Sequence, residues 1–239
     1  MLLLVMAIIF IAAFIRSAFG FGEALVAVPL LALIMPIEVA APVAVLVSIT
    51  VSVVALARDW RHVHFRSAGL LFASTCLGIP IGLWLLAVVP EQAIKSALGI
   101  VIIAFSAFFL LNKSPATLKS DKPAPIFGFV AGILGAAYGM NGPPLAAYGT
   151  LRRWSPQQFQ ATLQGYFLPA SAVIMLGYWA TGLWVEAVTR YYLLTLPVVV
   201  IAIVAGRAAN RRLPARLFAT LVHAGLVLVG AGLLWQAHA

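Results

Sequence analysis

Hydrophobic positions run through this chain in long stretches, without the alternation of apolar and polar residues that marks a half-buried strand. Residues free of Asp, Glu, Lys and Arg fill the ranges 67–90, 96–112, 123–151, 154–185, 191–206 and 217–239. About 20 apolar residues suffice to cross the hydrocarbon core of a bilayer as a helix. A transmembrane β-barrel would show short alternating segments instead. The pattern therefore predicts an all-α polytopic membrane protein.

The positions of Lys and Arg predict how these helices are oriented. Twelve of the 15 Lys and Arg residues fall within residues 58–66, 113–122, 152–153 and 207–216. Because positive residues concentrate in cytoplasmic loops, we expect all four regions to face the cytoplasm. A single crossing by residues 125–151 would reverse this distribution across the second half. That segment is therefore predicted to enter and leave on one side, as two shorter helices that meet around residues 139–142.

The two halves of the chain follow the same plan. The first is predicted as a broken or re-entrant hairpin over residues 1–36 and spans near 38–57, 67–89 and 91–111. The second is predicted as a hairpin over 125–151 and spans near 156–180, 187–206 and 214–236. A hairpin and three spans make an odd number of crossings, so the second unit should be inverted, as in many secondary transporters. We expect one membrane domain made of a first repeat, residues 1–111, a cytoplasmic linker, residues 112–124, and a second repeat, residues 125–239.

Composition supports the membrane assignment and argues against a nucleic-acid partner. The chain is 64% hydrophobic and only 9% charged, far from the values of a soluble domain. Its apolar start has no basic residue before it and no convincing cleavage region after it, so we expect it to be retained as structure. The net charge of +9 is explained by the loops that flank the spans, and no nucleic-acid partner is expected.

Few residues offer catalytic or metal-binding chemistry. Cys76 is the only cysteine, which excludes an intramolecular disulfide and a cysteine-cluster metal site. His62 and His64 lie in a basic loop where Asp59 is the only neighbouring carboxylate, and His223 is a lone membrane histidine. The chain lacks the phosphate-binding pattern G-x-x-x-x-G-K-[ST] and shows no convincing nucleophile or carboxylate pair. We expect no enzyme, no cofactor, no metal and no catalytic residue.

Two glycine-rich breaks interrupt the apolar sequence in similar fashion. The first contains Gly20 and Gly22, and the second contains Gly139, Asn141 and Gly142. Helix ends inside a bilayer are tolerated where protein or a water-filled cavity satisfies the free backbone groups. Each new helix would present the positive end of its dipole near the midplane. We therefore expect the breaks to form one anion pocket, with Asn141 as a helix N-cap and the following prolines in the first turn.

Four further side chains are candidates for this pocket. Arg16 is a basic residue inside an apolar run, where charge is costly and usually functional. It could bind an oxyanion through paired hydrogen bonds, or it could form a structural ion pair with Glu23. Glu23 could alternatively carry a proton. Tyr138 and Gln164 supply hydrogen-bonding groups near the second break and on the next span.

Several segments together resemble a known family. They are "GFGEALVAVPLLAL" and "PIEVAAP" in the first half, the linker, and "GFVAGILGAAYGMNGPP" and "WSPQQFQATLQGYF" in the second half. In these the chain is similar to the sulfite exporter TauE/SafE family of bacterial and archaeal membrane proteins. The resemblance implies export or exchange of sulfite or small organosulfur anions.

The leading hypothesis is thus a multi-pass secondary transporter for a small anion in the inner or plasma membrane, working by alternating access. A passive anion channel is the alternative. The expected partners are the anionic substrate and the lipid bilayer, with a proton or another coupling ion and a homodimer as further possibilities. The substrate-binding set comprises Arg16, Gly20, Gly22, Glu23, Tyr138, Gly139, Asn141, Gly142 and Gln164.

Overall fold

The computed structural model describes residues 1–111, 117–210 and 215–238 and, over these residues, is built from ten α-helices and one short 3-10 helix, η1. The first half contains α1 (Leu2–Phe19), α2 (Glu23–Ala32), α3 (Ile37–Asp59), η1 (Trp60–His62), α4 (Phe65–Val88) and α5 (Glu91–Leu111). The second half contains α6 (Ala124–Tyr138), α7 (Gly142–Leu151), α8 (Pro156–Ala180), α9 (Glu186–Asn210) and α10 (Ala215–His238). The all-α architecture predicted from the sequence is confirmed.

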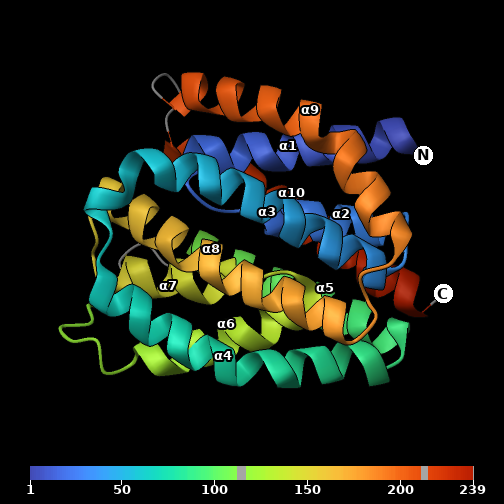
Figure 1. The fold of residues 1–239 in the computed structure, drawn as a ribbon, viewed down its shortest axis with the longest axis horizontal. Helices are drawn as coiled ribbons and strands as arrows, with labels where there is room; N and C mark the ends of the chain where they lie inside the picture. Colours follow the sequence, from blue (N-terminus) through green and yellow to red (C-terminus); the bar gives the residue numbers. More distant parts are fainter. Residues whose placement is uncertain (112–116, 211–214, 239) are drawn as a thin grey trace.

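The long helices run roughly parallel to one axis and alternate in direction (Figure 1). Both chain termini lie at one end of the bundle, and the linker between the halves lies at the opposite end. The short helices α2 and α7 lie towards opposite ends, so they leave the middle of the bundle in opposite directions. Each predicted hairpin is therefore present as a pair of helices with a break between them.

The two hairpins differ in length. The first helix of the first hairpin, α1, has 18 residues, whereas its counterpart α6 has 15. Among the described residues, five helices are long and apolar enough to cross a bilayer, namely α1, α3, α4, α5 and α9. Helix α8 has 25 residues but is more polar, with four glutamines in its first half. The chain is a multi-pass membrane protein in which α1 could span the bilayer by itself.

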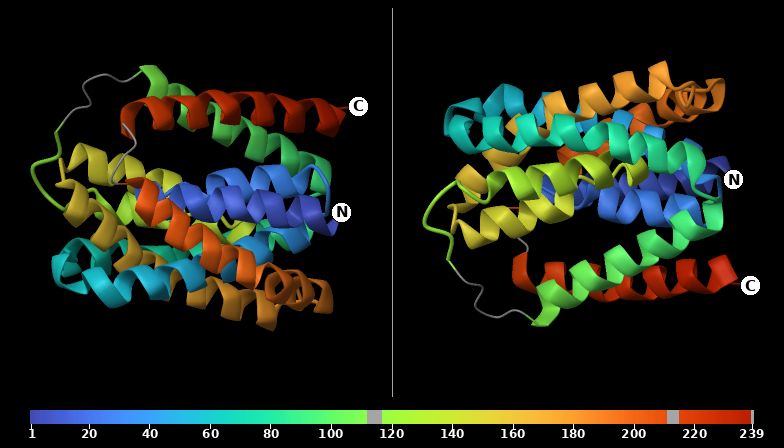
Figure 2. Two further views of the ribbon diagram at one scale, coloured as in Figure 1. Left: turned by 90° about the horizontal axis from the view of Figure 1, so that it is seen from above. Right: turned by 90° about the horizontal axis from the view of Figure 1, so that it is seen from below.

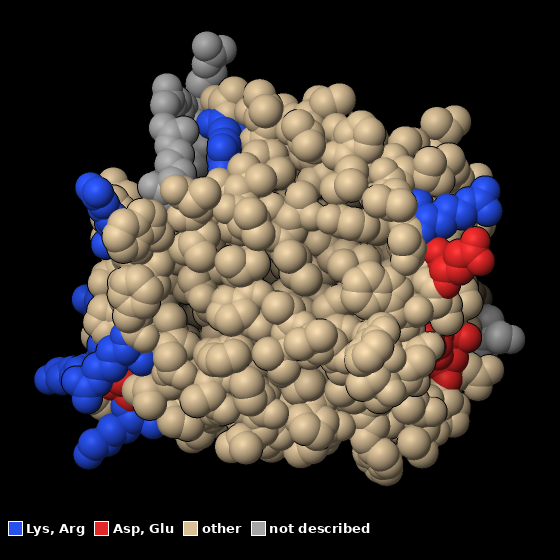
Figure 3. Space-filling model, viewed as in Figure 1, with Lys and Arg blue, Asp and Glu red and all other residues tan. Residues whose placement is uncertain are grey.

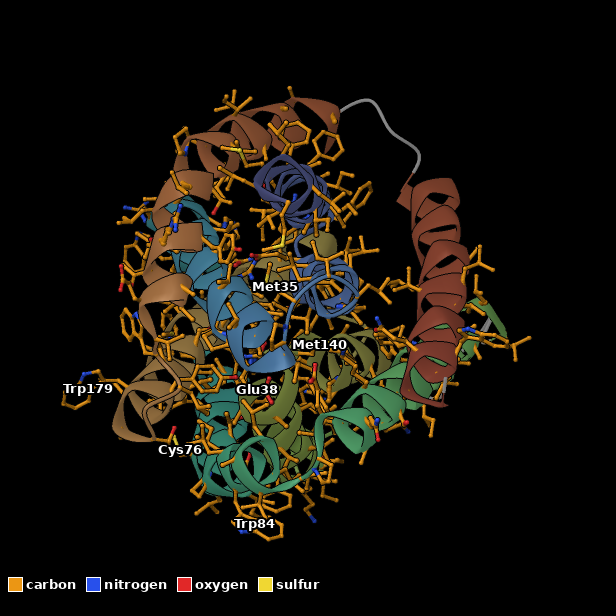
Figure 4. All side chains as sticks on the ribbon, turned by 90° about the vertical axis from the view of Figure 1, so that its right-hand side faces the viewer. Met35, Glu38, Cys76, Trp84, Met140 and Trp179 are labelled. Carbon is orange, nitrogen blue, oxygen red and sulfur yellow. The ribbon has the colours of Figure 1, made fainter. Side chains whose placement is uncertain are left out.

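Charge and aromatic residues divide the surface into an apolar middle and two polar ends. Figure 3 shows Lys and Arg gathered mainly at the end that holds the linker, with a broad uncharged face between the two ends. At the opposite end Trp84 and Trp179 point away from the bundle (Figure 4), with exposed fractions of 59% and 70%. Tryptophan is enriched where a membrane surface meets water. These features fit a bundle whose long axis lies along the bilayer normal.

Glycines allow the close approach of several helices. A Cβ atom on Gly128 or Gly132 of α6 would collide with the backbone of α4, and one on Gly78 of α4 would collide with the backbone of α6. Small residues at helix contacts are typical of membrane proteins. Gly128 and Gly132 therefore let α6 pack directly against the backbone of α4. Gly99 and Gly230 play the same part between α5 and α10, which run side by side along one edge (Figure 2).

Two apolar clusters enclose the centre of the bundle. The larger one joins α1, α2 and α3 to parts of α6, α8 and α9, and it includes Met35 and Met140, which lie in the interior in Figure 4. The smaller one surrounds α7 and the first half of α8. Phe21, in the first break, packs against both clusters. The two helix breaks are thus held between well-packed layers.

Candidate functional site

The first break is a turn that requires glycine. Helix α1 ends at Phe19, and its C-cap residue, Gly20, has a φ of +85° and an N–H that donates to the carbonyl of Arg16 at 2.6 Å. Gly22 precedes α2 with a φ of +98°. L-residues with a side chain rarely adopt this left-handed conformation. Gly20 and Gly22, on either side of Phe21, therefore reverse the chain over three residues, and Glu23 lies in the first turn of α2.

The second break is built differently. Helix α6 ends at Tyr138, and its C-cap residue, Gly139, has a φ of +67° and an N–H that donates to the carbonyl of Gly135 at 2.9 Å. This 5→1 hydrogen bond at a residue in the left-handed conformation is typical of an αL helix end. Asn141 occupies the predicted N-cap position of α7, but its side chain makes no capping hydrogen bond. Prolines occupy the first turn of α7, as expected.

Arg16 is the centre of a buried polar cluster. Only 4% of the residue is exposed. One terminal nitrogen of its guanidinium, Nη1, donates to the Oε2 of Glu23 at 2.7 Å and to the hydroxyl of Ser48. The other, Nη2, donates to the hydroxyl of Ser52 and to the Oε1 of Gln164 at 2.8 Å. The four terminal N–H groups of the guanidinium are thereby matched by four acceptors from α2, α3 and α8.

Two atoms of this cluster are left without a partner. The Nε of Arg16 and the Oε1 of Glu23 are buried and make no hydrogen bond. Glu23 is 1% exposed, so its second oxygen lies inside the protein and away from the surface. A buried polar atom without a partner is costly, and such atoms often mark a place where a ligand or water binds.

The two helix breaks meet at a small pocket. Its lining comprises Arg16, Phe21, Gly22, Glu23, Ala24, Leu25, Ser48, Asn141, Gly142, Pro143 and Phe167. The N-terminal residues of α2 and of α7 both contribute, so the positive ends of two helix dipoles face one space. The water-accessible volume is about 10 Å³, on the order of a single water molecule. The pocket must widen before it can hold an oxyanion.

The predicted site residues fall into three groups. Arg16, Gly22, Glu23, Asn141 and Gly142 line the pocket. Gly20 and Gln164 do not line the pocket but are hydrogen-bonded next to it. The side-chain amide of Gln164 donates to the carbonyl of Gly20 at 2.9 Å, and its oxygen accepts from Arg16. Tyr138 and Gly139 are not among the lining residues, although Gly139 shapes the second break.

Sequence reasoning did not identify Phe167, a residue of the pocket that contacts Arg16. The ring of Phe167 lies 4.7 Å from the guanidinium carbon of Arg16 and lines the same pocket. A cation over an aromatic face is stabilised by the ring quadrupole. Phe167 follows Gln164 by three positions and so shares a helix face with it. This spacing is the signal in the sequence that could have identified it.

The remaining hydroxyl groups divide between site and packing. Ser48 and Ser52 bind Arg16, whereas Thr50, between them in sequence, bonds the hydroxyl of Tyr192 on α9 at 2.8 Å. Tyr166 bonds Thr75 on α4 at 2.6 Å. The last two contacts are helix-to-helix hydrogen bonds, which are common between membrane helices.

A second polar cluster ties the linker to α7. Asp121 accepts hydrogen bonds from Tyr148 at 2.7 Å and from Ser67 at 2.8 Å, and it lies 3.2 Å from the guanidinium of Arg152. Burial opposes the charged form of Asp121, but these hydrogen bonds and the arginine outweigh it and hold the pKa of the carboxyl below its ordinary value. Arg152 also donates to the carbonyl of Leu118 at 2.9 Å. Tyr148 therefore anchors the linker and does not reach the pocket.

No metal centre emerges within the described residues. They contain no group of three His, Cys, Asp or Glu side chains able to hold an ion. His64 instead accepts a hydrogen bond from the backbone of Ser67 and caps α4. The side chain of His223 lies outside the described part of the chain.

Comparison with known proteins identifies the family. The model of the family described as sulfite exporter TauE/SafE matches residues 5–233, nearly the whole chain. No curated protein and no solved structure matches significantly. The chain belongs to the TauE/SafE family, and the resemblance inferred from its motifs is confirmed.

Proposed function

We propose that this TauE/SafE protein is a secondary transporter that exports or exchanges a small oxyanion, sulfite or an organosulfur anion, across the inner or plasma membrane. The observation that supports this most is the convergence of Arg16 and two helix N-termini on one buried pocket. Family membership supports transport of sulfite or related anions.

The chemistry of the pocket favours a small anion with several oxygens. Free N–H groups at a helix start bind negative charge, and here two starts face each other. A guanidinium adds a planar set of donors that suits oxyanions. Phe167 and Phe21 form apolar walls that would accept a small organic substituent on the sulfur.

The way the halves pack supports the proposal of alternating access. Helix α4 packs on α6, and α9 packs on α1, which are equivalent pairs if α1–α5 and α6–α10 form inverted repeats. Helices α3 and α8 pair with each other, as do α5 and α10. In such a plan one unit rocks against the other about the central site. The linker and the basic loops would face the cytoplasm, and both termini would lie on the other side.

The small volume of the pocket supports a transporter, with a passive channel as the alternative. A channel needs a continuous path for ions, whereas this pocket accommodates about one water molecule. We assign no enzymatic role to the protein, in keeping with its transporter family. A homodimer remains a prediction.

Counterflow in liposomes tests the proposal. Purified protein is reconstituted with unlabelled sulfite inside, and uptake of radiolabelled sulfite is followed at low external concentration. We expect saturable, transient accumulation, which Arg16→Ala abolishes and Arg66→Ala, a charge change on an exposed arginine, leaves intact. Large unitary currents without counterflow would establish the channel instead. The absence of both would reject transport of sulfite.

A further inference from the structure

The pocket is electrically balanced before any substrate enters. Arg16 and Glu23 form an ion pair at 2.7 Å, with 4% and 1% of their side chains exposed. The other lining residues are uncharged. A monoanion that entered alone would leave the pocket with a net charge of minus one, and an uncompensated charge away from water is strongly unfavourable.

The hydrogen bonds of Arg16 show where an anion can bind. Its terminal nitrogens are fully used by Glu23, Ser48, Ser52 and Gln164, and only Nε lacks an acceptor. An oxyanion that takes a second donor from Arg16 must therefore displace an existing acceptor. Oε2 of Glu23 is the acceptor most directly in competition, because it and the anion both carry negative charge.

We propose that the anion binds together with one proton, which Glu23 takes up as its carboxylate gives way to the anion at Arg16. This inference rests on the proposed anion site and specifies what else enters it. The proton comes from the solvent, and no covalent bond to the anion forms or breaks. The pocket then holds the arginine cation, the neutral acid and the monoanion, and its net charge is again zero. Oε1 of Glu23, which has no partner in the present structure, is a position where the proton can reside.

No other described titratable side chain is as well placed to take that proton. Helices α1, α3, α5, α7 and α10 pack against α2. Arg16 is the charged side chain from α1 that faces Glu23. On the others, Glu91 and Lys95 pair with each other on α5, Tyr148 of α7 binds Asp121, and Glu38 at the start of α3 does not line the pocket. The side chain of His223 on α10 lies outside the described residues.

Calorimetry on the wild-type protein tests the proposal directly. Sulfite is titrated into detergent-solubilised protein below the second ionisation of the ion, where the monoanion predominates, in buffers with different enthalpies of ionisation. We expect the observed heat to change with the buffer in proportion to the uptake of one proton per anion. In the same range, the affinity should rise about tenfold for each unit that the pH falls.

Two variants locate the proton. Glu23→Gln, purified in the presence of sulfite to offset its unpaired arginine, should bind sulfite without proton uptake and without the pH dependence. Glu38→Gln removes a carboxyl outside the pocket and should behave as wild type. Wild-type binding with no proton uptake would overturn the inference and leave the anion site standing. Retained uptake in Glu23→Gln would overturn the assignment to Glu23. A failure of wild type to bind sulfite at all would reject the anion site and this inference with it.

Discussion

The two helix breaks occupy corresponding positions in the two halves, yet they differ in charge and in construction. The first brings together Arg16 and Glu23 and reverses the chain through two glycines of positive φ. The second contains one such glycine and contributes no charged side chain to the pocket. It supplies a helix start, the amide of Asn141 and the rim of the pocket. The first break therefore provides the charged side chains of the pocket, and the second provides uncharged hydrogen-bond donors.

The largest expected effect comes from removing the charge of the first break. Arg16→Ala should weaken sulfite binding by about 2 to 5 kcal/mol, because a desolvated charge partner is lost. It should also destabilise the protein by about 3 to 5 kcal/mol if Glu23 stays ionised, since a buried carboxylate is then left unpaired. Thermal unfolding in detergent and equilibrium binding measure the two effects separately.

The double variant Arg16→Ala/Glu23→Gln separates these causes. It contains neither charge, so it should recover much of the lost stability while binding remains weak. Recovery of binding along with stability would mean that Arg16 acts only as a structural partner of Glu23.

A smaller effect should distinguish the backbones of the two breaks. A Cβ on Gly22 would have room, with its nearest neighbour in Ile15 at 3.4 Å, and a Cβ on Gly142 would lie 3.8 Å from Phe167. Only Gly22 has a positive φ, so Gly22→Ala should cost about 1 to 2 kcal/mol of stability. Gly142→Ala should leave the unfolding temperature nearly unchanged. Equal losses in the two variants would contradict the proposed difference in construction.

The neutral contribution of the second break should be smaller again. Asn141→Ala should weaken sulfite binding by about 1 kcal/mol, the typical value of a neutral hydrogen bond. Stability should change little, because the side chain makes no capping bond. A large loss of stability with unaltered affinity would show that Asn141 supports the fold and not the ligand.

The smallest effect concerns the linker cluster that holds α7 from outside. The pKa of Asp121 lies below its ordinary value, so its contribution to stability is present above about pH 3.9 and is lost as the pH falls through the lower, folded-state pKa. Asp121→Asn should therefore unfold more easily than wild type at neutral pH, and the difference should vanish in strong acid. Glu186→Gln, at an exposed position, serves as the control.

The sequence was most informative where physical constraints are local. Charge-free runs located the long helices, and the glycines of both breaks marked the helix ends, because positive φ is a property of a few residues. The pairing of Arg16 with Glu23 could be anticipated because both are charges in an apolar stretch. The contact of Phe167 with Arg16 was missed, because residues 151 positions apart meet only through the packing of α8, and the spacing of Phe167 from Gln164 was the one local signal for it. Asp121 was missed for the same reason, because its partners come from α4 and α7.

Two variants that differ in one side chain test the central claim most directly. Glu23→Gln and Arg16→Ala/Glu23→Gln share the neutral amide at the start of α2, and only the first retains the guanidinium. Equilibrium binding of sulfite to each purified protein, with folding verified by thermal unfolding, isolates the role of Arg16. The account predicts saturable binding to Glu23→Gln and an affinity at least about 30-fold weaker for the double variant, which corresponds to about 2 kcal/mol. Equal affinities in the two folded proteins would contradict an anion pocket centred on Arg16.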